Sequence, residues 1–256
     1  MVGKRYAVAD LHGQSNLYFQ IKEYINGNDI VYALGDFGDR GPEPWTTLQL
    51  ALDDSQFIYL MGNHDLILVE AMEEYMRVVA REGAYHVWDY AYCTQGKMNL
   101  AYLNGGLSTL EQWSNLKEEE RMKYYTQLKL LPLEVRLAAL DGRHFIYLNH
   151  AGYTPGCDEP TNVEDFVWNR DHWYDSWSRK DGALLINGHS PIQVLKKNLR
   201  ADTFDDSKGY LRYCDGHKIC IDMGAHATKE TILLDIDTLE AKTFKVQEEV
   251  NGTEKN

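Results

Sequence analysis

Three short polar runs near the start of the chain each come directly after an apolar stretch, and they limit the possible folds more than any other feature. The apolar stretches span residues 6–9, 30–34 and 57–61, and a segment with helical spacing follows each polar run. This repeated strand-loop-helix pattern predicts neighbouring parallel strands whose carboxyl ends share one edge of a sheet. We therefore expect the polar runs at residues 10–13, 35–41 and 62–65 to meet at that edge.

The side chains of these runs are of the kinds that bind divalent metal ions. Asp10, His12, Asp36 and Asn63 supply carboxylate, imidazole and amide groups without a thiolate. Such a set suits hard to borderline ions such as manganese, iron or zinc. The sequence therefore predicts a catalytic metal site at this edge of the sheet.

Two later histidines extend the set of candidate ligands. His150 and His189 also come directly after apolar stretches, at residues 145–149 and 184–188. The polar runs and these two histidines together offer seven candidate groups, more than one six-coordinate ion can take, so we expect two ions about 3.5–4 Å apart that share a carboxylate and a hydroxide. Asp36 is central in the set and is the predicted bridging carboxylate.

The motifs resemble those of the calcineurin-like metallophosphoesterases, and within them the phosphoprotein phosphatase branch. That branch carries G-D-x-H-G, G-D-x-x-D-R-G, G-N-H-E, H-A-G or H-G-G, and G-H-T in this order. The matching runs lie at residues 9–13, 35–41, 62–65, 150–152 and 188–190. The resemblance covers residues 4–238 and implies an α/β (α+β) fold with four layers, a two-sheet β-sandwich flanked by helices.

Two further runs are similar to those of the bacteriophage lambda protein phosphatase and its bacterial relatives: V-W-N-R at residues 167–170 and I-D-M-G-A at residues 221–225. This resemblance implies hydrolysis of phosphomonoesters, most of all phosphoserine and phosphothreonine on proteins. Residues 62–66 and 150–155 also match the symmetrical dinucleoside tetraphosphatases, so hydrolysis of diadenosine tetraphosphate is the alternative. That branch tends to have A-R-G where this chain has D-R-G at residues 39–41, which favours the protein phosphatase interpretation.

The resemblance also implies a role for each ligand. Asp10 and His12 are expected to hold the first ion, and Asn63, His150 and His189 the second, with Asp36 between them. A hydroxide bridging the two ions would then attack phosphorus in line, without a covalent enzyme intermediate. We expect manganese, with iron, zinc or nickel as the alternatives.

Four more residues are expected to act on the substrate. His64 is the predicted general acid for the leaving alkoxide, and Asp39 would keep it protonated and correctly oriented. Arg40 and Arg170 can each offer a planar fork of donors to the phosphoryl oxygens. The presence of all four speaks against a third interpretation, a non-catalytic scaffold that keeps only the metals.

Plainer interpretations remain for several side chains. Arg170 could simply pair with a carboxylate on the surface, and Trp168 is expected to pack in the core. The remaining histidines are expected to be solvated, although His226 follows a strand whose end should face the cleft; they are His86, His144, His172, His217 and His226.

Length and composition predict one catalytic domain over residues 1–247, followed by a disordered tail at 248–256. The chain has 256 residues, of which 44% are hydrophobic, which is enough for a sizeable core. Helices are expected at residues 66–81 and 118–130, within a helical excursion over residues 66–130 that lines the cleft. Two antiparallel strands, at 231–236 and 241–246, are expected to join strands 135–138 and 144–148 in the second sheet.

The charge and hydropathy of the chain limit its partners. The net charge of −13 argues against nucleic acid, because binding to a phosphate backbone requires clustered basic residues. No run of about 18 apolar residues and no room for a signal peptide are found, so a cytoplasmic protein without membrane attachment is expected. No regulatory subunit is evident, and a phosphoprotein or small phosphoester is the expected substrate. Cys214 and Cys220 flank a turn, and we expect them to stay reduced.

Overall fold

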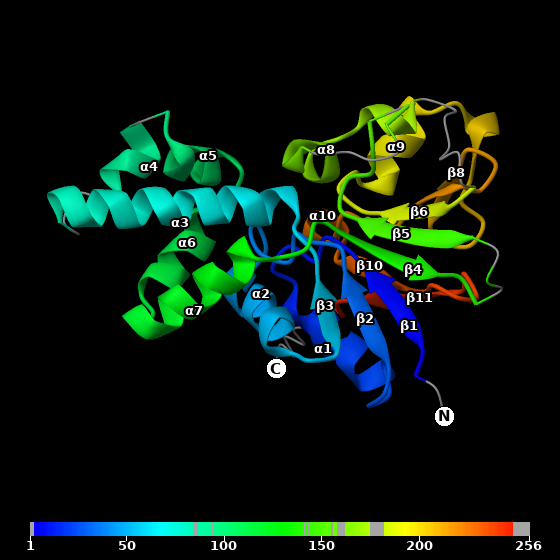
Figure 1. The fold of residues 1–256 in the computed structure, drawn as a ribbon, viewed down its shortest axis with the longest axis horizontal. Coiled ribbons are helices and arrows are strands. Elements are labelled where there is room, and N and C mark those ends of the chain that lie inside the picture. The colour runs from blue at the N-terminus through cyan, green and yellow to red at the C-terminus, as the bar shows by residue number, and fades with distance from the viewer. Residues whose placement is uncertain are drawn as a thin grey trace, which may run out of the picture.

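The computed structural model describes residues 3–83, 87–93, 95–140, 142, 144–154, 156–157, 162–174 and 182–247. Figure 1 shows two stacked β-sheets with helices on their outer faces and a helical arm that extends to one side. The tail predicted at 248–256 and the predicted solvated His86 lie outside the described residues. The four-layer arrangement predicted from the sequence is confirmed.

The first sheet contains the three strands that precede the polar runs. Its order is β11-β10-β1-β2-β3, with β1, β2 and β3 parallel to one another and β10 and β11 antiparallel. The strands span Arg5–Val8 (β1), Ile30–Ala33 (β2), Phe57–Tyr59 (β3), Glu230–Asp235 (β10) and Ala241–Lys245 (β11). As predicted, the carboxyl ends of β1, β2 and β3 therefore lie along one edge.

The second sheet carries the later histidines. Its order is β4-β5-β6-β9-β8-β7, and β5, β6 and β9 are parallel. The strands span Glu134–Ala138 (β4), Phe145–Asn149 (β5), Leu184–Asn187 (β6), Phe204–Asp205 (β7), Leu211–Tyr213 (β8) and Lys218–Cys220 (β9). His150 and His189 follow β5 and β6, so the candidate ligands come from both sheets.

The prediction that strands β10 and β11 belong to the second sheet is wrong. They do form an antiparallel pair, but β10 pairs with β1, where Tyr6 aligns with Asp235. The alternation of these strands explains their placement, because Ile232 and Leu234 face the second sheet while Leu233 and Phe244 face the helices on the other side. Such a pattern is satisfied in either sheet, so it does not identify the partner strand.

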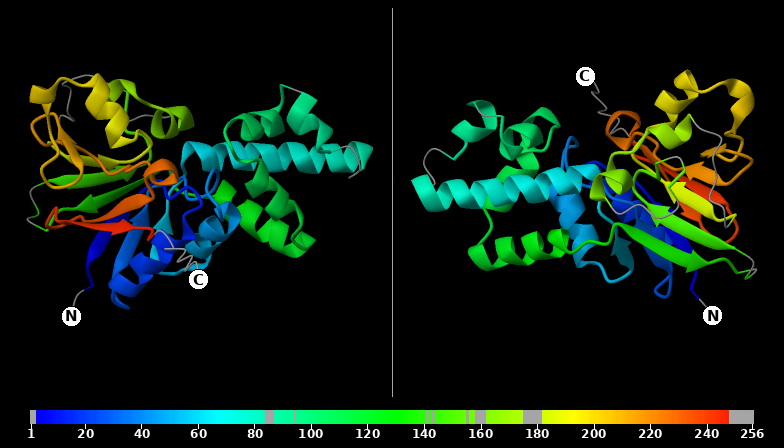
Figure 2. Two further views of the ribbon diagram at one scale, coloured as in Figure 1. Left: turned by 180° about the vertical axis from the view of Figure 1, so that it is seen from behind. Right: turned by 45° about the horizontal axis from the view of Figure 1, so that its top comes forward.

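Two hydrophobic clusters hold the layers together. Between the sheets, Tyr32, Leu60 and Ile232 pack against Leu148 and Ile186. On the outer face of the first sheet, alternate residues of the same strands pack against α1 (Ser15–Tyr24) and α2 (Pro44–Asp53). The outer face of the second sheet is covered by α8 (Val163–Val167) and α9 (Ile192–Asn198), as both views in Figure 2 show.

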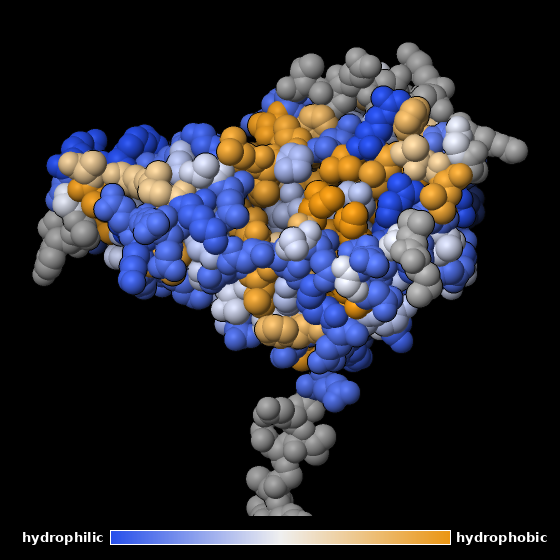
Figure 3. Space-filling view, turned by 60° about the horizontal axis from the view of Figure 1, so that its bottom comes forward, coloured by the Kyte–Doolittle hydropathy of each residue, from blue (hydrophilic) through white to orange (hydrophobic). Residues whose placement is uncertain are grey.

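The predicted helical excursion forms the arm seen in Figures 1 and 2. Its spine is α3 (Asn63–Glu82), longer than the predicted helix, and it returns through α4 (Asp89–Cys93), α5 (Lys97–Leu103), α6 (Leu107–Ser114) and α7 (Glu118–Lys129). Its apolar side chains face inward, where Met98, Leu110 and Trp113 are buried. On the face shown in Figure 3 the arm is mainly hydrophilic, while hydrophobic residues gather over the body.

The remaining described elements are short. A 3₁₀ turn at Asp171–Trp173 follows α8, another at Ala201–Thr203 precedes β7, and α10 (Ala225–Thr228) follows β9. The β8–β9 hairpin aligns Cys220 with Leu211, so Cys214 and Cys220 do not face each other and no disulfide joins them. None of the described helices is both long and apolar enough to cross a bilayer.

Candidate metal centre and active site

The loops after the strands place their side chains through unusual backbone conformations. Asp10, His12 and Asp36 have φ angles of 53°, 42° and 60°, and His189 in the other sheet has a φ angle of 65°. This left-handed region costs a non-glycine residue about 1–3 kcal/mol, and such strain tends to gather at functional sites. The strained backbone therefore lies in the same loops as the sequence motifs.

One group of candidate ligands forms around Asn63, the first residue of α3. The side-chain oxygen of Asn63 lies 3.0 Å from Nε2 of His150 and 2.9 Å from Nδ1 of His189, and these two nitrogens are 3.2 Å apart. The other nitrogen of His150 donates to the carbonyl of Leu34 at 2.6 Å, so Nε2 is the nitrogen of His150 that is left for a metal ion. A carboxylate oxygen of Asp36 lies 3.4 Å from the same Nε2. Lone pairs therefore converge on one point, as a cation requires.

A second group forms on the other side of Asp36. Ligand atoms of His12, Asp36 and His64 lie within 4.8 Å of one another, as do those of Asp36, His150 and His189. His12 donates from Nδ1 to the carbonyl of Gly38 at 3.0 Å, which leaves its Nε2 for a ligand. Asp36 belongs to both groups, which is the position that the sequence analysis gave to the bridging carboxylate.

Asp10 lies beside these groups and connects the two sheets. Its carboxylate accepts a hydrogen bond from the backbone N–H of His189 at 3.0 Å, although the two residues are far apart in the chain. Neither three-residue group includes Asp10. Burial, together with nearby Asp222, raises the pKa of Asp10 well above its usual value.

The electrostatics of the site fit divalent cations. Burial lowers the pKa values of His12 and His189 well below their usual range, so both imidazoles are neutral and can act as ligands. Burial also raises the pKa of Asp222 to about 6, with nearby Asp36 adding to the shift. Buried carboxylates that repel one another need a compensating positive charge. The residues present therefore suit a metal centre.

The predicted general acid is held by a carboxylate. Nδ1 of His64 lies 2.7 Å from a carboxylate oxygen of Asp39, and both side chains are buried. The guanidinium of Arg40 donates to Nε2 of His64 at 2.6 Å and to Nε2 of His12 at 3.1 Å. Arg40 therefore links the His64–Asp39 pair to His12 of the second group.

A small polar cavity of about 90 Å³ opens over these groups. Its lining combines candidate ligands with candidate substrate-binding residues: Asp36, Asn63 and His189 with Arg40, His64 and Arg170. Arg170 is exposed and forms no ion pair with any described residue, so the surface-pairing interpretation of Arg170 is not what the structure shows. Asp10, Asp39 and His150 are buried behind this lining.

Two residues that the sequence analysis did not assign also line the cavity, Asp222 and His226. Asp222 follows β9, just as Asp10 and Asp36 follow β1 and β2. Its position after an apolar run could therefore have identified it as a site residue from the sequence. His226 was expected to be solvated, but it is half-buried and its ring stands edge-on to His12 at 5.6 Å. The turn at Gly224, with a φ angle of 66°, begins α10, which brings His226 beside His12 of the second group.

Two further expectations are wrong. His172 is buried rather than solvated, because the turn after α8 tucks its ring against Trp173 and beneath Gly152, where Nε2 lies 2.9 Å from the amide of Asn187. Trp168 is not in the core: 36% of its surface is exposed, and its ring stands edge-on to His189 at 6.1 Å. It follows the last turn of α8, beyond the part of that helix that packs on the sheet.

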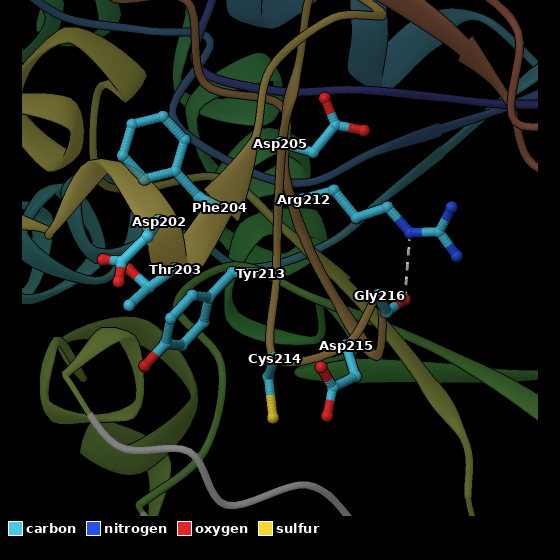
Figure 4. A pocket seen from close by; sticks show the side chains of 9 residues that line it. All are labelled: Asp202, Thr203, Phe204, Asp205, Arg212, Tyr213, Cys214, Asp215 and Gly216. Carbon is cyan, nitrogen blue, oxygen red and sulfur yellow. Dashed lines mark hydrogen bonds between the residues drawn. The ribbon is translucent and has the colours of Figure 1, made fainter.

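A larger depression of about 380 Å³ lies at the β7–β8 edge of the second sheet. Figure 4 shows acidic residues around it and Arg212, whose Nε donates to the carbonyl of Gly216 at 3.3 Å. Its described lining contains no histidine, and its residues come from the strands farthest in sheet order from β5. The candidate active site is therefore the smaller cavity.

Comparisons with known proteins agree with this geometry. Residues 4–203 match the family model described as calcineurin-like phosphoesterase. A solved structure titled as a putative diadenosine tetraphosphatase is similar, with 15% identity, a TM-score of 0.59 and coverage of 95% of this chain and 94% of that one. A protein serine/threonine phosphatase from Saccharomyces cerevisiae, with similarity to human phosphatase PP5, gives 13% identity, a TM-score of 0.54 and coverage of 98% and 82%. No curated protein matches the sequence significantly.

Proposed function

Because the chain belongs to the calcineurin-like phosphoesterase family, we propose that it is a metal-dependent phosphatase that hydrolyses phosphomonoesters. The observation that carries the proposal is the convergence of lone pairs around Asp36 from the loops of both sheets. In the proposed centre Asp10, His12 and Asp36 hold one divalent ion, and Asp36, Asn63, His150 and His189 hold the other. Bound metals would supply Lewis acidity and a nucleophile at neutral pH.

The remaining residues then have distinct tasks. Arg40 and Arg170 project into the cavity, where their guanidinium groups bind and orient the phosphoryl oxygens. His64 carries the proton that the leaving alkoxide needs, and Asp39 fixes the tautomer and orientation of its ring. In the described structure Nε2 of His64 accepts a hydrogen bond from Arg40, so the guanidinium has to turn toward the phosphoryl group before Nε2 can carry the proton for the leaving group.

Among phosphomonoesters, we propose phosphoserine and phosphothreonine of proteins as the preferred substrates. Support comes from the D-R-G run at residues 39–41 and from Arg170 beside the cleft in the W-N-R run. Diadenosine tetraphosphate is the second candidate, because Trp168 is partly exposed next to His189 and its indole is a group on which an adenine can stack.

The test is steady-state hydrolysis of a phosphothreonine peptide and of diadenosine tetraphosphate by one manganese-loaded preparation. A higher kcat/KM for the peptide would support the protein phosphatase, and a higher value for the dinucleotide would favour the second candidate. Trp168→Ala separates the two further, because loss of stacking should raise KM for the dinucleotide more than for the peptide. If neither substrate turns over while two metal ions per chain are present, the proposal is wrong.

A further inference from the structure

The helical arm reaches the centre through one buried side chain, Thr109 on α6. Its hydroxyl donates to Oδ1 of Asp39 at 2.5 Å and accepts the backbone N–H of Asp39 at 3.2 Å. Thr109 is fully buried, so water has no access to replace either hydrogen bond. One hydroxyl of the arm therefore holds both the backbone and the side chain of Asp39.

The two oxygens of Asp39 have different partners. Oδ2 accepts from Nδ1 of His64, and Oδ1 accepts from Thr109. A carboxylate held at both oxygens cannot rotate about its last bond without breaking one of these hydrogen bonds. Thr109 thus restricts the direction from which Asp39 meets the imidazole.

The loop before α6 completes the support. A Cβ on Gly106 would lie 2.7 Å from Oδ2 of Asp39, so only glycine lets the loop come this close. The carbonyl of Gly105 accepts the backbone N–H of Arg40 at 3.1 Å. Asp39 and Arg40 have φ angles of 62° and 65°, and the arm supplies hydrogen-bond partners to both of these strained residues.

We propose that Thr109 is a positioning residue for the His64–Asp39 pair, and that the arm thereby contributes to proton transfer to the leaving group. The inference rests on the proposed role of His64 as general acid. Thr109 does not touch the substrate. It acts by keeping Oδ2 of Asp39 aimed at Nδ1 of His64, which keeps the other ring nitrogen directed at the cavity.

The kinetic experiment compares Thr109→Val and Thr109→Ser on two substrates that differ in their need for an acid. On a phosphothreonine peptide, Thr109→Val should lower kcat about tenfold, because a positioned acid contributes about 10²–10⁴-fold and its orientation is only partly lost. On p-nitrophenyl phosphate, whose leaving group needs no proton, kcat should fall less than about twofold. Thr109→Ser keeps the hydroxyl and should restore the peptide activity, with metal content unchanged in both variants.

Thr47→Val is the matched control. Thr47 is equally buried and also donates one hydrogen bond, to the carbonyl of Glu43 at 2.7 Å, but it does not contact Asp39. If Thr109 had a purely structural role, Thr109→Val would lower the activities on the peptide and on p-nitrophenyl phosphate by the same factor, as Thr47→Val would. That outcome would overturn the inference, and so would an additional loss when Thr109→Val is combined with His64→Asn.

A spectroscopic measurement separates this inference from the proposed function. The Nδ1–H proton of His64 should give a low-field NMR resonance, which is assigned by its absence in His64→Asn. The resonance should persist in Thr109→Ser and Thr47→Val and should broaden or disappear in Thr109→Val. An unchanged resonance in Thr109→Val overturns the positioning role whether or not the enzyme hydrolyses the peptide, whereas a wild-type protein with no phosphatase activity overturns the proposed function.

Discussion

Asp36 illustrates how single residues are placed at the centre. Its backbone is left-handed, its N–H donates to the carboxylate of Asp65 at 3.0 Å, and its own carboxylate accepts the N–H of His64 at 2.9 Å. These contacts leave the second carboxylate oxygen facing His150. The hydrogen bonds of these two backbone N–H groups therefore fix the direction of the Asp36 carboxylate.

Replacing His64 with asparagine should separate proton transfer from phosphoryl binding. The variant should lose about 10²-fold or more in kcat on a phosphoserine peptide, and much less on p-nitrophenyl phosphate, because only the first leaving group needs a proton. Steady-state kinetics on both substrates measures the difference. His217→Asn, on the β8–β9 turn, is the control and should leave both rates unchanged; equal losses on both substrates in His64→Asn would refute the acid role.

The buried imidazole of His172 should make stability depend on pH. Burial and nearby Lys218 lower the pKa of His172 well below its usual value, so the unfolded chain binds the proton more readily than the folded chain. Above about pH 6.5 the imidazole is neutral in both the folded and the unfolded chain, and the protein keeps its full stability. As the pH falls below that value, the unfolded chain takes up the proton first, and the free energy of unfolding decreases by up to about 1.4 kcal/mol per pH unit.

Urea unfolding of the wild type and His172→Gln at pH 7.5 and pH 5.5 tests this dependence. The glutamine side chain does not titrate in this range, so the stability difference between the two proteins should narrow at pH 5.5. A constant difference for His172→Gln would contradict the assignment of His172 as a neutral buried group.

At the scale of elements, the centre depends on how closely the loops approach one another. Gly62 ends the β3 loop and begins α3, and a Cβ there would lie 2.1 Å from Oδ1 of Asp36. The carboxylate of Asp65, in the first turn of α3, accepts the N–H of Gly62 at 2.9 Å, as expected for an acidic residue at a helix amino terminus. The β2 and β3 loops therefore interlock at this point.

Gly62→Ala should disturb this contact and displace Asp36. We expect the variant to lose metal binding and to be less stable by about 1–3 kcal/mol, the usual cost of forcing extra volume into a packed site. Elemental analysis and urea unfolding measure the two effects. Gly27→Ala is the matched control, because nothing lies within 4 Å of a Cβ at Gly27; an equal effect there would contradict the steric explanation.

The sequence predicted best those elements that can be recognised from one short segment alone. The strands before the three polar runs, and those before His150 and His189, were predicted because each is a short apolar run that ends in a turn. The strand that pairs with β10 was not predicted correctly, because strand pairing depends on distant residues that no local pattern identifies. For the same reason, nothing near Thr109 in the sequence indicated its contact with Asp39, 70 residues away.

Exposure was also difficult to predict from the sequence. Trp168 and His172 are close in the chain, yet the tryptophan is partly exposed and the histidine is buried. A turn of a few residues decides which side chain faces inward, and the short α8 has too few residues for a periodic pattern. The general preference of tryptophan for the core and of histidine for the surface gave the wrong answer at both positions.

At the scale of the whole molecule, the candidate centre joins the two sheets. Asn63 follows a strand of the first sheet, while His150 and His189 follow strands of the second. The backbone N–H of His189 also donates to Asp10 across the same junction. Ions held there would therefore bind only when the sheets are correctly stacked, which couples metal binding to folding.

Metal removal should accordingly lower the thermal stability of the whole protein. At a free manganese concentration about 100 times the Kd, binding adds about 2.7 kcal/mol for each ion, and one ion alone corresponds to a Tm shift of roughly 5–10 °C for a chain of this size. Differential scanning calorimetry with manganese and with a chelator measures the shift. Asp36→Asn should lose most of the shift and of the bound metal, whereas Asp53→Asn, an exposed carboxylate 2.6 Å from Lys123, should keep both; two retained ions in Asp36→Asn would contradict the bridging role.

The position of β10 and β11 beside β1 has a consequence for biosynthesis. The first three strands leave the ribosome early, but the strand that covers the edge of β1 begins only at Glu230. His189 follows Asn63 by 126 residues, which takes roughly 6–25 s to translate at 5–20 residues per second. During that interval the nascent chain carries only part of its ligand set, at first four of the six predicted ligands, and an unpaired strand edge, the kind of surface on which chaperones act and from which aggregation starts.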